Sequence, residues 1–468
     1  MRATTLGALR ASGYRDRTVK EELRDNLLAR ISSGAPLFAG IVGYEDSVVP
    51  ALERALLAGH DVIMLGERGQ AKSRLIRHLV FLLDEEVPVV AGCEINDHPY
   101  RPICARCRAL VAERGDDTPV DWIARELRYA EKLATPDTAV ADLIGDVDPI
   151  RVAEGRYLAD ELTIHYGLVP RTNRGIFAIN ELPDLPERIQ VSLLNILEER
   201  DVQVRGYKVR LPLDLMLIAS ANPEDYTHRG RIITPLKDRF GTQVRTHYPR
   251  RAEDEIAIMR QEARPLPPGI DVKVPLPYEE ILARFTARLR ANAQINQRSG
   301  VSVRFSIGNL ETTRASALRR AARLGEDLAV PRIVDLWAVL PASIGRIEFD
   351  TLDEGREPEL LARALKAAIV DVWRARLGDV DLTGLVEPFE QGAELEVDDL
   401  TPAGELLAAL DRRARSALQS ALPHLDLPDE SPASLASALE LCLEGLYLEG
   451  LISKHESDAG AWRFGGGG

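Results

Sequence analysis

The sequence contains few cysteines, few aromatic residues and no long apolar run. Four cysteines among 468 residues are too few for a disulfide framework, so we expect a reducing compartment, the cytoplasm. No stretch approaches the roughly 18 apolar residues of a membrane span. The basic N-terminus also lacks the apolar core of a secretory signal. These absences argue against a disulfide-rich secreted scaffold and against a membrane-spanning protein.

The chain also lacks an excess of positive charge. Its formal net charge of −14 argues against duplex DNA or an anionic membrane as the main partner, because both are bound through lysine and arginine. A local basic groove stays compatible with this composition. The hydrophobic fraction of 45% and charged fraction of 28% are typical of a soluble globular protein, and the length predicts about two to four domains.

The most informative segment lies between an apolar run at 62–65 and a helical pattern that starts at Leu75. It matches the phosphate-loop pattern G-x-x-x-x-G-K-[ST], whose backbone N–H groups bind phosphate at the start of a helix. We expect Lys72 to reach the β- and γ-phosphates of a nucleotide and Ser73 to bind Mg²⁺. An ordinary glycine-containing turn is the alternative, which the flanking strand and helix disfavour. The predicted nucleotide-binding residues are Gly66, Glu67, Arg68, Gly69, Gln70, Ala71, Lys72 and Ser73.

One residue of this loop departs from the pattern. Ala71 stands where the last glycine is expected. A methyl group is tolerable there only if the residue keeps a negative φ.

Two later apolar segments end in polar residues. The first, at 175–179, is followed by Asn180 and Glu181, and the second, at 217–221, by Asn222. Parallel sheets place ligands at the carboxyl ends of their strands. We therefore expect Glu181 to polarise a water for attack on the γ-phosphate and Asn222 to orient that water. Asn180 stands where P-loop ATPases usually carry a Mg²⁺-holding aspartate, and its amide lacks that charge.

Two arginines complete the predicted constellation. Arg239, between Asp238 and Phe240, suits an arginine finger offered to a neighbouring subunit, because its planar charge can meet the phosphate charge of the transition state. Arg304, at the start of a helix in a second, helical region, can reach back onto the phosphates. Taken alone, each of them would be read as a surface arginine.

The order and composition of these motifs resemble the AAA+ ATPases, in particular the clade of the magnesium chelatase ATPase subunit and the MoxR-type ATPases. The resemblance covers approximately residues 35–345. It implies ATP and Mg²⁺ as cofactors, and a ring, usually a hexamer, with ATP between subunits. It assigns Gly66–Ser73 as Walker A, Asn180-Glu181 as Walker B, Asn222 as sensor 1, Arg239 as the arginine finger and Arg304 as sensor 2.

Two further segments match features of this clade. Residues 202–211 resemble its presensor-1 hairpin, which faces a ring pore or a partner, and residues 151–170 lie where the clade inserts its helix-2 loop. Asn180 and Ala71 depart from the family pattern. The asparagine affects the expected rate of hydrolysis more than nucleotide binding.

The predicted fold class is α/β. We expect a P-loop AAA+ module, with a parallel sheet flanked by helices, then a helical lid and a mostly helical C-terminal extension. Strands are predicted at 61–65, 87–91, 175–179 and 214–219. The predicted domains are a helical leader (1–34), the nucleotide-binding domain (35–263) with an insertion (92–175), the lid (264–349) and the extension (350–468), which is winged-helix-like at its end.

A second candidate site lies in the insertion. Cys93, His98, Cys104 and Cys107 form the pattern C-x4-H-x5-C-x2-C. Three thiols and an imidazole can complete the tetrahedral shell of a structural zinc ion, although the spacing is not that of a common zinc finger. The alternative is three reduced thiols in a loop. Catalytic zinc is not expected, because four protein ligands leave no open position.

The leading functional hypothesis is an ATP-hydrolysing ring motor that remodels a partner protein or assists metal insertion. Its partners would be further copies of itself and a companion protein, such as one that contains a von Willebrand factor A domain. Two alternatives stay open: a nucleotide-gated scaffold with negligible hydrolysis, and a DNA-associated ATPase regulator that uses the C-terminal wing. The acidic charge counts against the second alternative.

Overall fold

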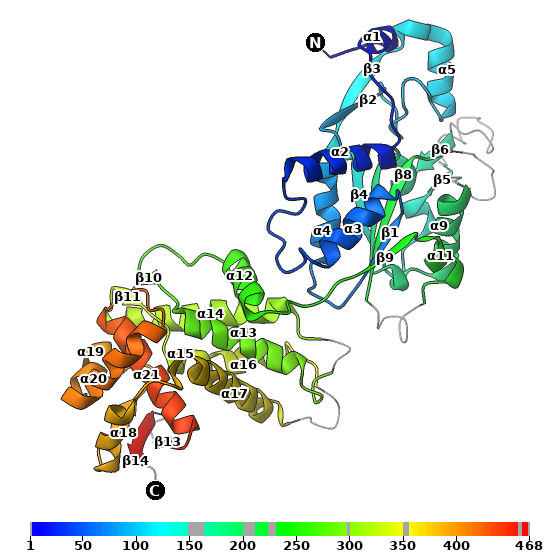
Figure 1. Ribbon diagram of the computed structural model, residues 1–468. Coiled ribbons are helices and arrows are strands. Elements are labelled where there is room, and N and C mark those ends of the chain that lie inside the picture. Colours follow the sequence, from blue (N-terminus) through cyan, green and yellow to red (C-terminus); the bar gives the residue numbers. More distant parts are fainter. Residues whose placement is uncertain are drawn as a thin grey trace. The chain divides into compact units, whose positions relative to one another are not determined.

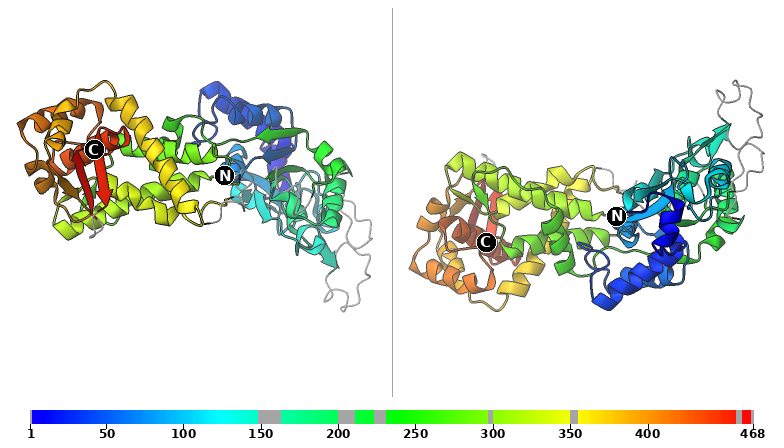
Figure 2. Two further views of the ribbon diagram at one scale, coloured as in Figure 1. Left: turned by 90° about the horizontal axis from the view of Figure 1, so that it is seen from below. Right: turned by 90° about the horizontal axis from the view of Figure 1, so that it is seen from above.

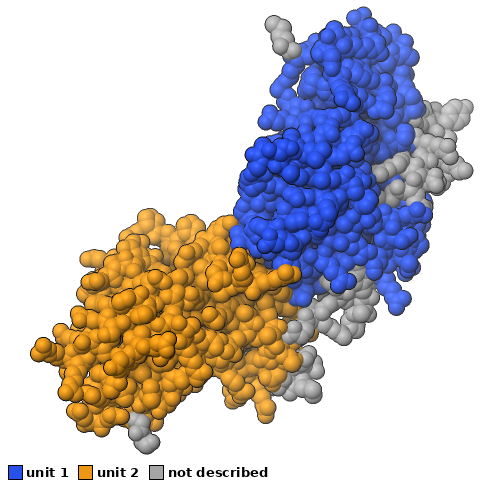
Figure 3. All heavy atoms as spheres, viewed as in Figure 1, with its two compact units in different colours: residues 1–247 blue, residues 248–468 orange. Residues whose placement is uncertain are grey.

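The computed structural model describes residues 2–147, 163–199, 211–222, 231–296, 300–349, 355–456 and 461–466. These residues form two compact units, 1–247 and 248–468 (Figure 3). The predicted end of the nucleotide-binding domain at residue 263 differs from this division. Helix α12 (Ala252–Glu262) packs against α13 (Leu276–Arg290) and α14 (Val303–Leu324), so it belongs to the second unit.

A five-stranded parallel sheet forms the centre of the first unit, in the order β4-β7-β8-β1-β9. In the middle of the sheet, Val62 of β1 lies opposite Ile218 of β8 on one side and Thr242 of β9 on the other. All residues of β1, β7 and β8 are buried, as expected for a sheet covered on both faces. The strands are β1 (Val62–Leu65), β4 (Tyr129–Leu133), β7 (Gly175–Asn180), β8 (Leu215–Ala221) and β9 (Thr242–Arg245).

Alternate side chains of the sheet enter two different cores. One core contains Val62 and Met64 and is closed by α2 (Val19–Ser33), α3 (Val48–Leu57) and α4 (Lys72–His78). The other contains Ile63 and Leu65 and is closed by α9 (Glu187–Glu199) and α11 (Thr234–Arg239). Figure 1 shows the sheet between these two groups of helices. The three-layer α/β arrangement predicted from the sequence is therefore present.

The predicted strands at 61–65, 175–179 and 214–219 all lie in this sheet, but the one at 87–91 does not. Strand β2 (Glu86–Val90) pairs antiparallel with β3 (Val120–Ala124) in a separate ribbon. Its expected place is taken by β4, which lies inside the predicted insertion. Strand β4 is at the sheet edge and only partly buried, so it has no apolar run that periodicity could detect.

The predicted leader is part of the first unit rather than a separate element. Helix α1 (Leu6–Ala11) packs against the turn η2 (Gly115–Asp117), and the Leu6 N–H donates to Thr118 O at 2.9 Å. The other short elements of this unit are η1 (Leu79–Leu82), α5 (Ala105–Arg114), η3 (Arg125–Arg128), α6 (Val140–Leu143), β5 (Gly145–Val147), β6 (Ile164–Tyr166), α8 (Leu168–Arg171) and η5 (Leu182–Asp184).

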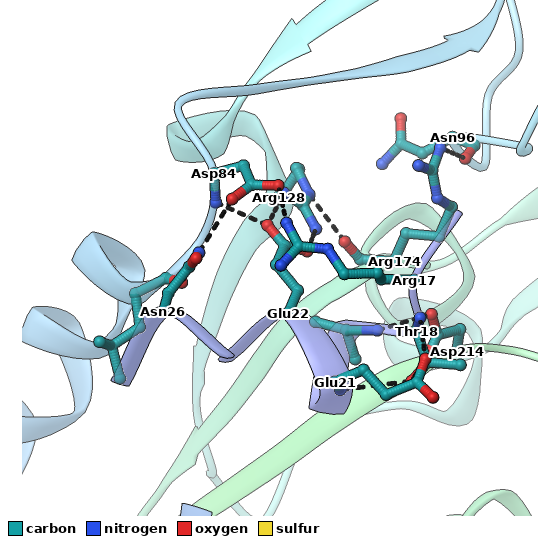
Figure 4. Close-up of polar contacts among 12 residues, drawn as sticks. Arg17, Thr18, Glu21, Glu22, Asn26, Asp84, Asn96, Arg128, Arg174 and Asp214 are labelled. Atoms are coloured by element: carbon teal, nitrogen blue, oxygen red, sulfur yellow. Dashed lines mark hydrogen bonds and ion pairs between the residues drawn. The ribbon is translucent and has the colours of Figure 1, made fainter. Parts of the chain in front are cut away.

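A buried ion pair fixes α2 to the rest of the unit (Figure 4). Glu22 and Arg128 are 3% and 1% exposed, and two guanidinium nitrogens donate to the two carboxylate oxygens at 2.8 and 2.5 Å. The Arg128 Nε–H donates to Arg174 O at 2.7 Å, and Glu22 also accepts from the Asp84 N–H. Each of the three guanidinium nitrogens and both carboxylate oxygens thus has a hydrogen-bond partner, which makes the burial of the pair tolerable.

The second unit begins with the lid helices. Helix α17 (Glu357–Leu377) runs along α13, as Figures 1 and 2 show, and Arg288 and Asp371 form an ion pair between them. The other elements of this part are β10 (Asp271–Val272), which pairs with β11 (Leu328–Ala329), α15 (Ile333–Trp337) and α16 (Val339–Ser343).

The extension after residue 350 does not form a core of its own. It shares one continuous apolar core with α13 and α14, and α21 contributes many of its residues. A three-stranded antiparallel sheet in the order β12-β14-β13 lies near the C-terminus. The elements are α18 (Thr383–Glu390), β12 (Leu395–Val397), α19 (Ala403–Ala408), α20 (Arg412–Ala421), η7 (Leu422–His424), α21 (Pro432–Leu448), β13 (Ile452–Glu456) and β14 (Trp462–Gly466). Among the described residues, no helix has both the length and the apolar character needed to cross a bilayer.

Candidate nucleotide-binding site

The phosphate loop joins β1 to α4 and is shaped by one side chain. Gln70 Oε1 accepts from Thr246 Oγ1 at 2.7 Å and from the Glu67 N–H at 3.1 Å. The Gly66 N–H donates to Ala221 O at 3.1 Å. A Cβ atom on Gly66 would lie 1.9 Å from Thr246 Oγ1 and 2.3 Å from Gln70 Oε1. Glycine is therefore required at position 66 by the closeness of its neighbours.

The lysine of the loop is buried and points back into it. Lys72 is 7% exposed, and its Nζ donates to Gly66 O and, at 2.8 Å, to Glu67 O. Carbonyl oxygens of the loop thus hold the ammonium group close to the loop backbone. A phosphate bound by the N–H groups of the same loop would meet this charge at short range, so the residues present fit a nucleotide phosphate.

Ala71 does not meet the condition of a negative φ that the sequence sets for a methyl group at this position. Ala71 has φ 56° and ψ 15° and lies directly before α4. The backbone turns from the loop into the helix at this residue, and the turn requires the left-handed conformation that glycine adopts without strain. A methyl group in this conformation costs roughly 1 kcal/mol. The loop therefore keeps the shape typical of a glycine at a small energetic cost.

The ends of β7 and β8 lie beside the first turn of α4, which follows the phosphate loop. Asn180 Oδ1 lies 3.5 Å from Ser73 Oγ and accepts from Ser220 Oγ at 3.1 Å. The Glu181 N–H donates to Ser220 Oγ at 3.3 Å, and Glu181 has a left-handed φ of 54°. Asn222, one residue past β8, is 5% exposed. The structure thus brings Ser73, Asn180 and Glu181 into one cluster at the carboxyl edge of the sheet.

Two members of this cluster were missed by the sequence analysis, Ser220 and Glu131. Asn180 Nδ2 donates to Glu131 Oε1, and Arg77 donates to both oxygens of Glu131 at 2.7 and 2.9 Å. These Arg77 bonds, with help from Tyr129 and Asn180, hold the pKa of Glu131 below its usual value. Glu131 was missed because its strand, β4, was not recognised as part of the sheet. The signal available in the sequence was an acidic residue inside a short strand-like segment.

The two arginines lie in different units. Arg239 is the last residue of α11 and is exposed, whereas Phe240 beside it is buried at 4%. Arg304 is exposed in the first turn of α14, where its N–H donates to Ser302 Oγ at 3.1 Å. The predicted approach of Arg304 to the nucleotide stays a prediction. Residues 202–210 of the predicted hairpin and 151–162 of the predicted helix-2 loop lie outside the described residues.

The cysteines of the insertion come together with a different fourth residue. The side-chain ligand atoms of Cys93, Asp97, Cys104 and Cys107 lie within 4.8 Å of one another. His98 is not among them, which corrects the predicted set: its Nδ1 accepts from the Tyr100 N–H at 3.0 Å, and its Nε2 lies 3.2 Å from Asp16 Oδ1.

The surroundings of these groups shift their pKa values. Hydrogen bonds from Cys104 and then Cys107 lower the pKa of the Cys93 thiol to about 3. Burial raises the pKa of Asp97 to about 6. In this buried cluster, a negative charge on one group therefore disfavours a negative charge on its neighbours.

Parts of this chain are similar to known proteins. The sigma-54 interaction domain matches residues 154–239. The magnesium-chelatase 38 kDa subunit of Rhodobacter capsulatus is 29% identical over 48% of this chain and 59% of its own length. The chloroplastic magnesium-chelatase subunit ChlI-1 of Arabidopsis thaliana is 30% identical over 48% of this chain and 51% of its own length. The 38 kDa subunit of Acidiphilium rubrum is 28% identical over 72% of this chain and 99% of its own length. These similarities, together with the motifs, support an AAA+ ATPase of the magnesium chelatase clade.

The chain spans little more than half the length of the Rhodobacter and Arabidopsis subunits. Among solved structures, a complex between subunits BchI and BchD of magnesium chelatase contains a chain with 24% identity and a TM-score of 0.36, covering 61% of this chain and 89% of that one. The similarity to these ATPases implies the use of ATP and Mg²⁺.

Proposed function

We propose that this AAA+ ATPase hydrolyses ATP with Glu181 as the water-polarising carboxylate. The observation that carries the proposal is the cluster formed by the ends of two strands and the first turn of α4. Ser73 Oγ lies 3.5 Å from Asn180 Oδ1, and Ser220 links Asn180 to the backbone of Glu181. Such contacts fix the strand ends relative to the loop that would hold the phosphates, and positioning is the main catalytic contribution in phosphoryl transfer.

Each loop residue has a defined task in this proposal. The N–H groups of residues 66–73 bind the phosphate oxygens, and Lys72 neutralises their charge. Ser73 and Asn180 present the oxygens that would hold Mg²⁺, which supplies further neutralisation of phosphate charge when bound. Asn180 is neutral, but its amide hydrogen bond to Glu131 brings a carboxylate next to it. Glu131 thus supplies negative charge close to the place where the family usually has an aspartate.

We propose that Asn222 orients the attacking water and that Arg239 acts on the ATP of a neighbouring copy in a ring, by analogy a hexamer. Exposure of Arg239 at the end of α11 supports this role, since a finger must project from its own subunit. Arg304 is proposed to report nucleotide state to the lid.

Steady-state ATPase measurements on the full chain test the proposal. Lys72→Ala is expected to abolish ATP binding at millimolar nucleotide, and Glu181→Gln is expected to bind ATP but to hydrolyse it at least about 10²-fold more slowly. Arg30→Gln, a change of a charged residue on α2 far along the chain from the motifs, serves as the control. Hydrolysis at the wild-type rate by Glu181→Gln would contradict the assignment.

The downstream task is proposed from the relatives. Those matched here are named subunits of magnesium chelatase, so we propose that this chain also works with a companion protein, one that contains a von Willebrand factor A domain, in remodelling or metal insertion. Its cysteine usage supports a cytoplasmic location. A pull-down with the full chain in a non-hydrolysable ATP analogue, compared with Lys72→Ala, tests for a nucleotide-dependent partner.

One alternative is favoured by a specific observation. Because Asn180 replaces an anion, hydrolysis can be negligible, and the protein would then be a nucleotide-gated scaffold. The ATPase measurement above separates the two. The DNA-associated alternative finds less support. Helices α20 and α21 precede the β13–β14 hairpin, but 13 of the 17 residues of α21 are buried. A helix so enclosed has no face left to enter a DNA groove.

A further inference from the structure

We propose that Cys93, Asp97, Cys104 and Cys107 bind one structural zinc ion. The four ligand atoms lie within 4.8 Å of one another. Around a tetrahedral zinc ion, with ligands at about 2.0–2.3 Å, neighbouring ligand atoms stand roughly 3.5–4 Å apart, so the side chains need only small movements to close the shell. Four protein ligands leave no position for a substrate, which makes the site structural.

Asp97 carries the strongest evidence for a cation. Its side chain is completely buried at 0% exposure. Its Oδ2 accepts from the Ile103 and Cys104 N–H groups at 3.1 and 2.9 Å. Its Oδ1 accepts no hydrogen bond from any residue that the structure describes. A buried carboxylate oxygen without a partner is costly, and a bound cation among the neighbouring sulfurs removes that cost.

The sulfurs are surrounded as metal-bound thiolates usually are. The Asp97 N–H lies 3.3 Å from Cys93 Sγ, and the Cys107 N–H lies 3.3 Å from Cys104 Sγ. Such N–H donors favour the anionic form of sulfur that binds zinc. Cys104 and Cys107 are 5% and 0% exposed, so the sulfurs are also shielded from solvent.

The packing of α5 explains why this segment needs a metal. Of its ten residues, only Cys107 is buried. Apart from Cys107, the helix packs on the core mainly through the partly buried Leu110, so its apolar contact with the rest of the unit is small. A zinc ion bound by Cys104 and Cys107 would fasten the start of α5 to the segment after β2, which supplies Cys93 and Asp97. Small elements with little apolar content are commonly stabilised in this way.

Metal analysis of the full chain, purified without chelators from zinc-supplemented medium, tests the proposal. We expect one zinc per chain. Cys104→Ser and Asp97→Ala should lower zinc retained after dialysis by more than about tenfold. His98→Gln should keep it, because His98 contacts Tyr100 and Asp16 instead. Cys442→Ala is the matched control, since Cys442 is a buried cysteine of the second unit.

Zinc removal from the wild-type chain keeps the test decisive if a variant fails to fold. Chelation should speed amide exchange in residues 92–118 while ATP binding by the P-loop is retained. The proposal is overturned by far less than one zinc per chain, by stoichiometric iron in its place, or by loss of zinc in His98→Gln as complete as in Cys104→Ser. Because ATP binding is measured separately, these outcomes leave the proposed ATPase activity untouched.

Discussion

The neighbours of Asn180 explain why a neutral residue stands at this position. Its Nδ2 donates to Glu131 while its Oδ1 accepts from Ser220 and faces Ser73. An aspartate has no hydrogen to donate, so at this position it would bring two carboxylates into contact. Like charges so close raise the pKa of one of them, and the site would gain a proton rather than a second negative charge. Asn180 and Glu131 are therefore best understood as a pair.

This pairing makes a prediction that runs against the family pattern. Asn180→Asp alone is expected to raise the half-saturating Mg²⁺ concentration of the ATPase by up to about tenfold. The repulsion raises the pKa of one carboxyl group, and one unit of pKa corresponds to a tenfold change in its ionisation equilibrium. The double variant Asn180→Asp with Glu131→Gln moves the charge without the repulsion and should recover most of the loss. Mg²⁺ titration of the ATPase rate measures both, with Glu131→Gln alone as control. Equal behaviour of the single and double variants would refute the pairing.

Ala71 allows a second prediction at this scale. Ala71→Gly should remove the strain of a left-handed alanine and stabilise the first unit by up to about 1 kcal/mol, although the added freedom of the unfolded chain offsets part of the gain. Ala29→Gly, at an exposed position of α2, should destabilise by about 1 kcal/mol instead. Urea unfolding of the two variants compares the signs. Destabilisation by both changes would show that Ala71 is not strained.

The sequence predicted the site only where its residues are contiguous or follow an apolar strand. Lys72 and Ser73 belong to one contiguous loop, and Asn180 and Glu181 follow an apolar strand. The structure brings Ser73, Asn180 and Glu181 into one cluster. Glu131 met neither condition, since its partner lies far along the chain. The proposed zinc ligands show the same limit. Their spacing indicates three thiols, but it does not show where a side chain points. The sequence therefore predicts His98 rather than its neighbour Asp97.

At the level of whole elements, α2 is the part of the fold whose role was least visible in the sequence. Apolar spacing indicated a helix but not what it covers. In the structure it closes one face of the sheet with Val19, Leu23 and Leu27. The misplaced strand has a similar cause. Segment 87–91 is more apolar than β4, yet β4 lies in the sheet, because edge position and pairing partner depend on the whole fold rather than on local hydrophobicity.

The buried pair that holds α2 provides a stability prediction. Glu22→Ala leaves Arg128 buried without its partner and should lower the free energy of unfolding of the first unit by about 3–5 kcal/mol. Glu21→Ala removes only the exposed carboxylate of the capping box, whose loss costs about 1 kcal/mol. Unfolding of this unit in urea is measured through the loss of ATP-analogue binding. Equal costs for the neighbouring changes would argue that the Glu22–Arg128 pair does not anchor the helix.

At the scale of the whole molecule, the second unit has one shared apolar core, although the sequence predicts a separate lid and extension. Helices α13 and α14 pack into one apolar core with α17 and α21, so a movement of the lid has to carry the C-terminal sheet with it. In an ATPase that changes shape with its nucleotide, the extension would then act as part of the moving lid.

Assembly is the last property that the proposal requires of the whole molecule. Arg239 is exposed at the end of α11, and an arginine finger is worth about 10³-fold or more in rate, because it stabilises charge in the transition state. Arg239→Ala should therefore lower the ATPase rate by roughly that factor while ATP binding stays within about twofold of wild type. Lys237→Ala, a neighbouring exposed cation on the same helix, should have little effect.

Mixing two inactive proteins distinguishes action in trans from action within one chain. Arg239→Ala subunits keep Glu181, and Glu181→Gln subunits keep Arg239, so a mixed ring contains some interfaces at which both groups are intact. Activity should return on mixing, rise with the fraction of mixed interfaces and fall on dilution below the concentration at which rings form. If dilution to monomers leaves the activity per chain unchanged, or if mixing restores none, then Arg239 does not serve a neighbour's nucleotide and the ring is not needed for hydrolysis.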